Sequence, residues 1–216
     1  MHPQTHALLS WLLAEAGRLE HRRDRALVLG AGLAPDLDGL SILFGEAAYH
    51  TWHRVLCHHG LGAATIALAC AAAARQRART GLLALAAAHL HFVCDMVGSA
   101  GPDGSIWPVP YLVPFDLQHP GFAPSWQWQL ASWQNVTITL LALAASAWLA
   151  SRRGRTLLEA VSLRLDGAVV DAIRRRLPPP GGSPALPMPQ GAAASSPKLE
   201  TAEMNETGRC DPKGNV

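Results

Sequence analysis

The chain has 216 residues, of which 49% are hydrophobic and only 16% are charged. Its mean hydropathy of +0.12 is too high for an ordinary soluble domain of this length, so the composition indicates a membrane protein. The formal net charge of +2 is small and the basic residues are segregated along the chain, which argues against nucleic-acid binding. The four cysteines show no CxxC spacing, so neither a zinc ribbon nor a disulfide framework is predicted.

Five apolar segments follow one another in the first 150 residues. They cover residues 5–17, 26–44, 61–74, 80–97 and 135–150. A clean membrane span needs about 20 apolar residues, so several segments are marginal and the first could be a half-embedded or core helix. Their many Ala and Gly residues favour close helix packing. We predict an all-α, polytopic membrane protein with about four or five membrane-embedded helices; an Ala-rich soluble helical protein is the alternative fold class.

Two further regions follow the apolar segments. Residues 156–177 have apolar side chains near helical spacing and end in a run of arginines, which is typical of an amphipathic helix at a surface. From Pro178 onward the composition turns to Pro, Gly, Ser and Ala, which bury too little surface to offset the entropy of ordering. We therefore expect a membrane-embedded domain over 1–151, a basic amphipathic helix over 152–177 and a disordered tail over 178–216.

Three clusters of arginine separate the apolar segments. The clusters are Arg18, Arg22, Arg23 and Arg25, then Arg75, Arg77 and Arg79, then Arg152, Arg153 and Arg155. If each apolar segment crosses the bilayer once, all three clusters lie on one face, which the positive-inside rule assigns to the cytoplasm. The N-terminus is then outside and the C-terminal tail is cytoplasmic.

Candidate metal ligands gather on the outer side of this topology. They are His6 in the first segment, Asp36 and Asp38 in the second, His53 and His58 before the third, and His91 and Asp95 in the fourth. The topology rests on the arginines alone, so this convergence independently supports one shared site on the outer face.

Each motif also has a simpler interpretation. His91 and Asp95 are four residues apart, share a helix face and can hold one ion; a polar pair inside a membrane helix is costly, which favours a functional role. His89 points to a different face. An aspartate after a proline turn commonly caps a helix, and loop histidines such as His50 and His59 are often solvated. Nitrogen and carboxylate ligands without thiolates suit zinc, manganese or iron.

Taken in chain order, the motifs resemble those of the membrane-bound metal-dependent hydrolase family of the YdjM type. That family's patterns read roughly TH, PDxD, HRGxTHS and HxxxDxxxxxG. The matching residues are Thr5-His6, Pro35-Asp36-Leu37-Asp38, His53-Arg54-Val55-Leu56-Cys57-His58-His59, and His91 to Asp95 followed by Gly101 and Trp107-Pro108. Val55, Cys57 and His59 stand where the third pattern has Gly, Thr and Ser. The resemblance covers residues 1 to about 150.

The resemblance implies a multi-pass protein of the bacterial inner membrane with a helical metal site, distantly similar to zinc-dependent phospholipase C. From the sequence alone, His6 could simply follow Thr5, a residue that caps a helix. The resemblance makes His6 an expected metal ligand. The expected cofactor is a divalent metal, zinc first, with manganese or iron as alternatives, and a metal-activated water would cleave an ester or phosphoester. The expected partners are the lipid bilayer and that substrate. The alternative is a membrane protein that binds a metal for structure, sensing or transport without turnover.

Arg54 is the one basic residue that the topology leaves on the outer side. One interpretation is an ion pair with a neighbouring carboxylate. The other is catalytic, because a guanidinium next to His53 can grip the phosphate or ester oxygen and stabilise charge in the transition state. The sequence leaves both open, and Arg54 is the candidate catalytic residue.

Overall fold

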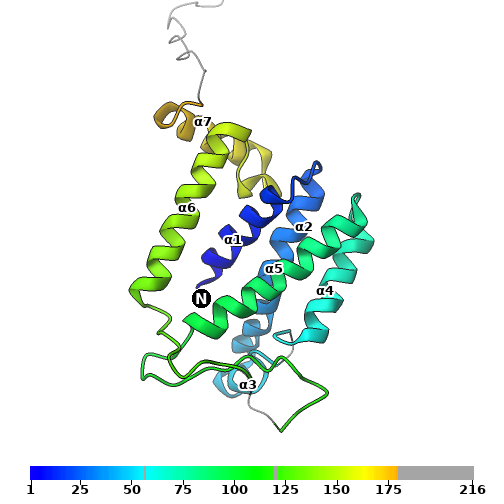
Figure 1. The fold of residues 1–216 in the computed structure, drawn as a ribbon, viewed down its shortest axis with the longest axis vertical. Helices are drawn as coiled ribbons and strands as arrows, with labels where there is room; N and C mark the ends of the chain where they lie inside the picture. The colour runs from blue at the N-terminus through cyan, green and yellow to red at the C-terminus, as the bar shows by residue number, and fades with distance from the viewer. Residues whose placement is uncertain (56, 119–120, 180–216) are drawn as a thin grey trace, which may run out of the picture. The chain divides into compact units, whose positions relative to one another are not determined.

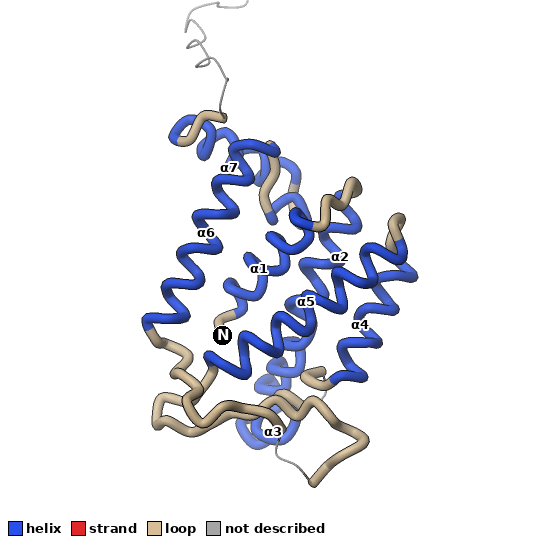
Figure 2. The backbone as a smooth tube through the Cα atoms, viewed as in Figure 1, coloured by secondary structure: helices blue, strands red, loops and turns tan. Residues whose placement is uncertain are grey.

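The computed structural model describes residues 1–55, 57–118 and 121–179. The regular structure of these residues is helical and includes no β-strand, which confirms the predicted all-α fold (Figures 1 and 2). The α-helices are α1 (Pro3–Ala16), α2 (Arg22–Leu33), α3 (Glu46–Trp52), α4 (Gly60–Ala73), α5 (Arg77–Gly98), α6 (Trp133–Arg153) and α7 (Leu163–Arg176). Two 3-10 helices, η1 (Ala34–Phe44) and η2 (Leu157–Ala160), complete the set.

Three helical segments of the described chain are long and apolar enough to cross a membrane. They are Arg22–Phe44, which joins α2 to η1, and the helices α5 and α6. α4 is a shorter apolar helix; with 14 residues, it reaches only about 21 Å at 1.5 Å per residue, less than the roughly 30 Å hydrocarbon core. The predicted polytopic membrane fold is confirmed.

Alanine-rich packing places α5 at the centre of the helical bundle. α5 packs against α1, α2 and α4, and its residues Ala84, Ala87 and Ala88 are fully buried. Gly32 on α2 shows how closely these helices approach, because a Cβ there would lie 1.7 Å from Ser10 Oγ on α1. Side chains on the inner face of α5 are therefore shielded from lipid and water.

The predicted arginine clusters meet at one end of the bundle, opposite α3 and the long loop between α5 and α6 (Figure 1). Glu15 is buried there and accepts hydrogen bonds from Arg153 and, at 2.8 Å, from Arg155 Nε. Arg25 makes a bidentate pair with Glu159, in which its NH2 donates to Glu159 Oε2 at 2.9 Å. These pairs fasten α1, α2 and the chain after α6 together.

The region that follows α6 is divided rather than continuous. Residues 156–177 were expected to form one amphipathic helix, but η2 ends at Ala160 and α7 begins at Leu163. The break is stabilised by Asp166, whose Oδ1 accepts hydrogen bonds from the backbone and the hydroxyl of Thr156, both at 2.6 Å. Ser162 caps the new helix by accepting from Leu165 N. The expected tail lies outside the described residues from position 180 onward.

Candidate metal centre

His91 and Asp95 project from the buried face of α5, one helical turn apart. The His91 Nδ1 atom lies 2.9 Å from the carbonyl oxygen of Gly32 on α2. A carbonyl can only accept, so Nδ1 must carry the proton and donate. The unprotonated Nε2 atom of a neutral His91 then faces Asp95, at 3.7 Å from its Oδ2.

His58 reaches the same point from the segment between α3 and α4. Its side chain is fully buried, and its Nδ1 lies 2.9 Å from Asp38 Oδ2. Burial alone would lower the pKa of His58, but hydrogen bonds to the Asp38 and Asp95 carboxylates outweigh it and raise that pKa. The Asp38 carboxylate therefore holds the proton on Nδ1 and directs Nε2 toward α5.

The Nε2 atoms of His58 and His91 are 3.1 Å apart. Both Nδ1 atoms are committed as donors to oxygen, so two neutral rings would point their Nε2 lone pairs at each other. That arrangement is repulsive unless a cation, either a proton or a metal ion, lies between them. The ring orientations thus require positive charge at this point.

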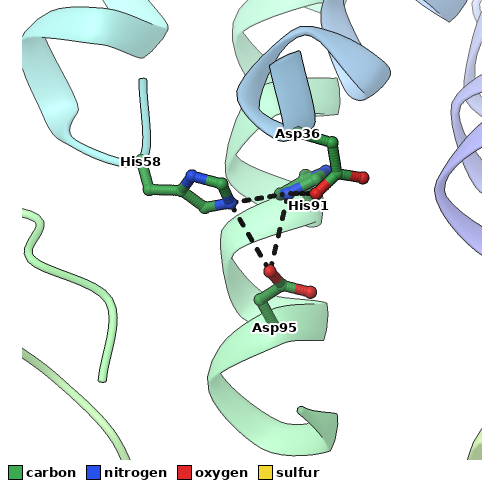
Figure 3. A group of neighbouring side chains, drawn as sticks. All are labelled: Asp36, His58, His91 and Asp95. Carbon is green, nitrogen blue, oxygen red and sulfur yellow. Dashed lines mark hydrogen bonds and ion pairs between the residues drawn. The ribbon is translucent and has the colours of Figure 1, made fainter. Parts of the chain in front are cut away.

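Two carboxylates complete the group. Asp36, His58, His91 and Asp95 each offer one ligand atom, and these atoms all lie within 4.8 Å of one another (Figure 3). His58 Nε2 is 3.5 Å from Asp95 Oδ2, and His91 Nε2 is 3.5 Å from Asp36 Oδ1. Ligands about 2.0–2.1 Å from a tetrahedral metal are about 3.3 Å apart, so the separations suit such an ion. We call these four residues the Asp–His group.

Asp36 differs from the other three members of the Asp–His group. Its side chain is 25% exposed, whereas those of His58, His91 and Asp95 are at most 5% exposed. Its Oδ2 atom is nevertheless buried and has no hydrogen-bond partner among the described residues. An unsatisfied carboxylate oxygen is costly, and a bound cation would satisfy it. Because Asp36 is the most exposed of the four residues, the Asp–His group is accessible from the side on which Asp36 lies.

Asp38 lies one hydrogen bond outside the Asp–His group, and His53 lies one hydrogen bond further out, behind Asp38. The two oxygens of Asp38 accept separately from two histidines, Oδ2 from His58 and Oδ1 from His53 Nδ1 at 3.0 Å. The His53 ring stacks on Tyr49, with centroids 4.5 Å apart. Asp38 therefore orients both rings, as carboxylates behind metal-binding histidines commonly do.

His6 lies beside the Asp–His group on the α1 side. Its ring stacks on His91 at a centroid distance of 3.8 Å, and its Nε2 is 3.1 Å from Asp95 Oδ1. Its buried Nδ1 has no partner among the described residues. The amino group of Met1 also contacts Asp95 Oδ1. Asp95 thus links α1 to the site through one oxygen and faces His58 and His91 with the other.

Arg54 forms the ion pair that the sequence left open. Its NH2 group donates to Asp95 Oδ2 at 3.3 Å and to Ser99 Oγ at 2.7 Å, and its NH1 group donates to the Trp107 carbonyl at 2.7 Å. The guanidinium carbon lies 5.3 Å from the centre of the Trp107 ring. The Nε atom is buried and has no partner among the described residues. Three of the five guanidinium N–H groups are therefore engaged by the protein.

A pocket of about 260 Å³ adjoins this arginine. Its lining residues are Tyr49, His53, Arg54, Val55, Trp107, Pro108 and Pro110. Burial raises the pKa of the Tyr49 hydroxyl, so this group stays protonated at neutral pH. The pocket combines apolar walls with a cation, an imidazole and a phenol, and Arg54 connects it to Asp95.

Several supporting residues were not predicted from the sequence. The Gln127 amide donates to the carbonyl oxygens of Asp95, Met96 and Trp107, at 3.0, 3.0 and 3.1 Å, and so ties the long loop to the end of α5. No spacing or motif singles out Gln127. The Gly32 carbonyl that fixes His91 could not be inferred either, because a backbone acceptor has no sequence signal of its own.

The remaining histidines of the motifs lie elsewhere. His59 caps α4, its Nδ1 accepting from Gly62 N at 2.9 Å. His89, on another face of α5, donates to the Leu85 carbonyl through Nδ1 and interacts with the Tyr111 hydroxyl at 2.9 Å. The side chain of His50 lies outside the described residues.

Replacing Asp38 by asparagine tests its orienting role. The amide keeps the shape but loses the charge and one acceptor, so the two histidine rings can no longer both be held. We expect about tenfold weaker metal binding, at the lower end of the range for residues behind metal ligands, as measured by competition with a chelator. The matched control is Asp103→Asn, since the Asp103 side chain lies in an exposed turn and accepts hydrogen bonds from Ser105, its one hydrogen-bond partner within the described part of the chain. An unchanged affinity in Asp38→Asn would contradict the assignment.

A family model described as YdjM inner membrane protein matches residues 1–170 of the chain. The searches of curated proteins and of solved structures found no match to the chain.

Proposed function

The chain belongs to the YdjM inner membrane protein family, and on that premise we propose that it is a metal-dependent hydrolase that cleaves an ester or phosphoester. The observation that carries the proposal is the pair of buried imidazoles. His58 and His91 have both Nδ1 protons committed to oxygen, so their Nε2 atoms converge with Asp36 and Asp95 on one point. The protein is a multi-pass inner-membrane protein, and this point lies inside its helical bundle.

The donor set fits a divalent metal. Two imidazole nitrogens with two carboxylate oxygens suit zinc, and manganese or iron are the alternatives. The buried, unpartnered Oδ2 of Asp36 supports the fit, because it needs a cation or a donor. A divalent ion held there would lower the pKa of a bound water toward about 7 and so supply hydroxide at neutral pH.

The protein's own side chains divide the remaining tasks. Asp38 holds the His58 ring in place, and the Gly32 carbonyl does the same for His91. We assign to His6 and His53 either a direct ligand role or support of the ligands through Asp95 and Asp38. His6 contacts the Asp–His group directly through Asp95, whereas His53 reaches it through Asp38.

The neighbouring pocket supplies a place for the substrate. Arg54 lines this pocket, and an N–H of its guanidinium that the protein does not engage can donate to a phosphoryl or carbonyl oxygen while others stay anchored on Ser99 and the Trp107 carbonyl. Charge that develops on this oxygen in the transition state would strengthen the hydrogen bond, which is how a positioned donor accelerates hydrolysis. The apolar walls lower the local dielectric constant and so make such a bond stronger.

One observation favours a metal site without turnover, for structure, sensing or transport. His58, His91 and Asp95 are almost completely buried, as ligands of a structural metal often are, and only Asp36 opens the group to its surroundings. Hydrolysis requires an open coordination position, whereas a structural site is closed. The two functions therefore differ in a measurable property.

The test is a screen of detergent-purified, metal-loaded protein against phosphodiester, phosphomonoester and carboxylic ester substrates. A hydrolase should turn over one of these classes, and a chelator or His91→Ala should abolish that turnover. Tightly bound metal with no turnover in any class would leave the non-catalytic function as the better account.

We further propose that the site faces the outer side of the membrane and that the C-terminal tail is cytoplasmic, as the arginine clusters indicate. Cys57 is half-buried in the segment next to the site, whereas Cys70 and Cys94 are buried. A membrane-impermeant thiol reagent applied to intact cells should therefore label Cys57 and leave Cys210 unlabelled until the cells are lysed. Labelling of Cys210 before lysis would reverse the orientation.

A further inference from the structure

The end of the bundle opposite the Asp–His group carries an unbalanced positive surface. The arginines of the three clusters are exposed there except Arg25 and Arg155, and Arg164 and Arg174 to Arg176 on α7 are exposed as well. We call this surface the basic end. In Figure 1 it comprises the ends of α1, α4 and α6 and the helix α7.

Acidic side chains at the basic end are turned inward. Glu15, Asp24, Glu159 and Asp166 are all buried and hydrogen-bonded within the bundle. Among the described residues at this end, only Glu20 and Asp171 are exposed acids. The positive charge of the surface is therefore not neutralised by the protein itself.

The α7 helix adds an apolar stripe to this surface. Its inner face is docked on the bundle, since Asp166 and Val170 are buried and Arg174 Nε donates to the Ser151 carbonyl at 3.1 Å. Leu165, Val169 and Ala172 are all exposed, and their spacing of four and three residues places them on one side of the helix. This side has no partner in the described part of the chain.

The last turns of α6 carry a second feature of a membrane interface. Trp148 is exposed, and the guanidinium of Arg152 lies over its ring, 4.4 Å from the ring centre. Tryptophan is enriched at the level of lipid headgroups, where an arginine beside it can reach the phosphates. This pair marks the depth at which the basic end meets the headgroups.

We propose that α7 lies in the headgroup region of the adjacent leaflet and that its arginines bind anionic phospholipid headgroups. The apolar stripe enters the boundary between headgroups and acyl chains, while Arg164 and Arg175 beside it and Arg176 at its C-terminal end bind the phosphates. An amphipathic, arginine-bearing helix has the chemistry for this position. A second copy of the chain is a poor partner, because it would bring the same positive charge to the interface.

The test uses the full chain reconstituted in phosphatidylcholine vesicles and measures its preference for spin-labelled phosphatidylglycerol over spin-labelled phosphatidylcholine. Changing Arg164, Arg175 and Arg176 together to glutamine should reduce this preference at least about fivefold, since each arginine near a charged surface contributes binding. The matched control changes Arg18, Arg77 and Arg79 to glutamine, which removes the same charge from the same end but leaves α7 intact. This control variant should reduce the preference less. All six arginines in the two variants are exposed, so neither set of changes disturbs the packed core.

A second measurement reports the position of the helix itself. An environment-sensitive dye on Val169→Cys, in a chain with Cys57→Ser and Cys210→Ser, should shift to the blue when phosphatidylglycerol is added. The same dye on Asp171→Cys, which lies on nearly the opposite face of α7, should not.

Three results would overturn the proposal. The first is equal loss of preference in both triple variants, which would mean that general attraction to the basic end is sufficient. The second is no blue shift at Val169→Cys. The third is a DNA oligonucleotide that competes with phosphatidylglycerol at equal concentration, which would make nucleic acid the partner.

Discussion

Alanine in place of His91 or Asp95 is expected to weaken metal binding by more than about a hundredfold. Each change removes a ligand atom, and the supporting residues behind metal ligands alone are worth about 10- to 100-fold. Asp95→Ala also leaves Arg54 and His6 without their shared carboxylate. Chelator competition on detergent-purified protein gives the affinity, and elemental analysis gives the metal content.

His89→Ala is the matched control for this experiment, because it removes the same kind of ring from the same helix. The His89 ring bonds the Leu85 carbonyl and the Tyr111 hydroxyl and is directed away from the Asp–His group. Its loss should change metal affinity little, although it loosens the loop that carries Tyr111. Equal losses of metal in His89→Ala and His91→Ala would contradict the assigned ligands.

Lysine in place of Arg54 is expected to lower the turnover of the identified substrate about a hundredfold, the scale for a lost transition-state donor. The ammonium group can still pair with Asp95, but it cannot contact Ser99 and the Trp107 carbonyl as well and still donate to a substrate in the pocket. Metal content and accumulation in the membrane should be retained. Steady-state kinetics on metal-loaded protein measures the change.

The exposed Arg79, at the start of α5, provides the control, and Arg79→Lys should leave turnover unchanged. The ion pair of Arg54 with Asp95 also suggests a structural role for this arginine. If Arg54→Lys loses its metal or no longer accumulates in the membrane, Arg54 is a structural partner of Asp95 and not a catalytic residue.

The apolar helices were predictable because they are continuous apolar runs. The segments expected at 80–97 and 135–150 correspond to α5 and α6 within a few residues, and the one at 61–74 corresponds to the shorter α4. The turn expected at Pro35 also exists, since α2 ends at Leu33 and the chain continues as η1. In these segments apolar length and a single proline decide the structure.

The long loop after α5 and the short helix α3 were not predictable in the same way. The loop is held by individual polar contacts, such as Gln127 on the end of α5 and Asn135, whose side chain donates to the Gly98 carbonyl at 2.7 Å. Contacts of this kind have no period in the sequence. The α7 helix is shortened for a similar reason, because Thr156 and Asp166 pair across the break.

The candidate site was predictable as a set of residues but not as an arrangement. The spacing of His91 and Asp95 was sufficient to place them on one helix face. Asp36 and Asp38 are indistinguishable in the sequence, yet Asp36 joins the Asp–His group while Asp38 orients histidines. The difference depends on where a loop 20 residues further along places His58, which only the tertiary fold determines.

X-ray absorption spectroscopy of the detergent-purified full chain, at the edge of the metal that it contains, tests the central claim most directly. We predict a first shell of nitrogen and oxygen, including two imidazoles, at about 2.0–2.1 Å if the metal is zinc. The imidazole signal should fall by half in His58→Ala loaded with the same metal. Sulfur at about 2.3 Å, a shell without imidazole, or protein that holds no metal at all would contradict the assignment of Asp36, His58, His91 and Asp95 as a metal centre.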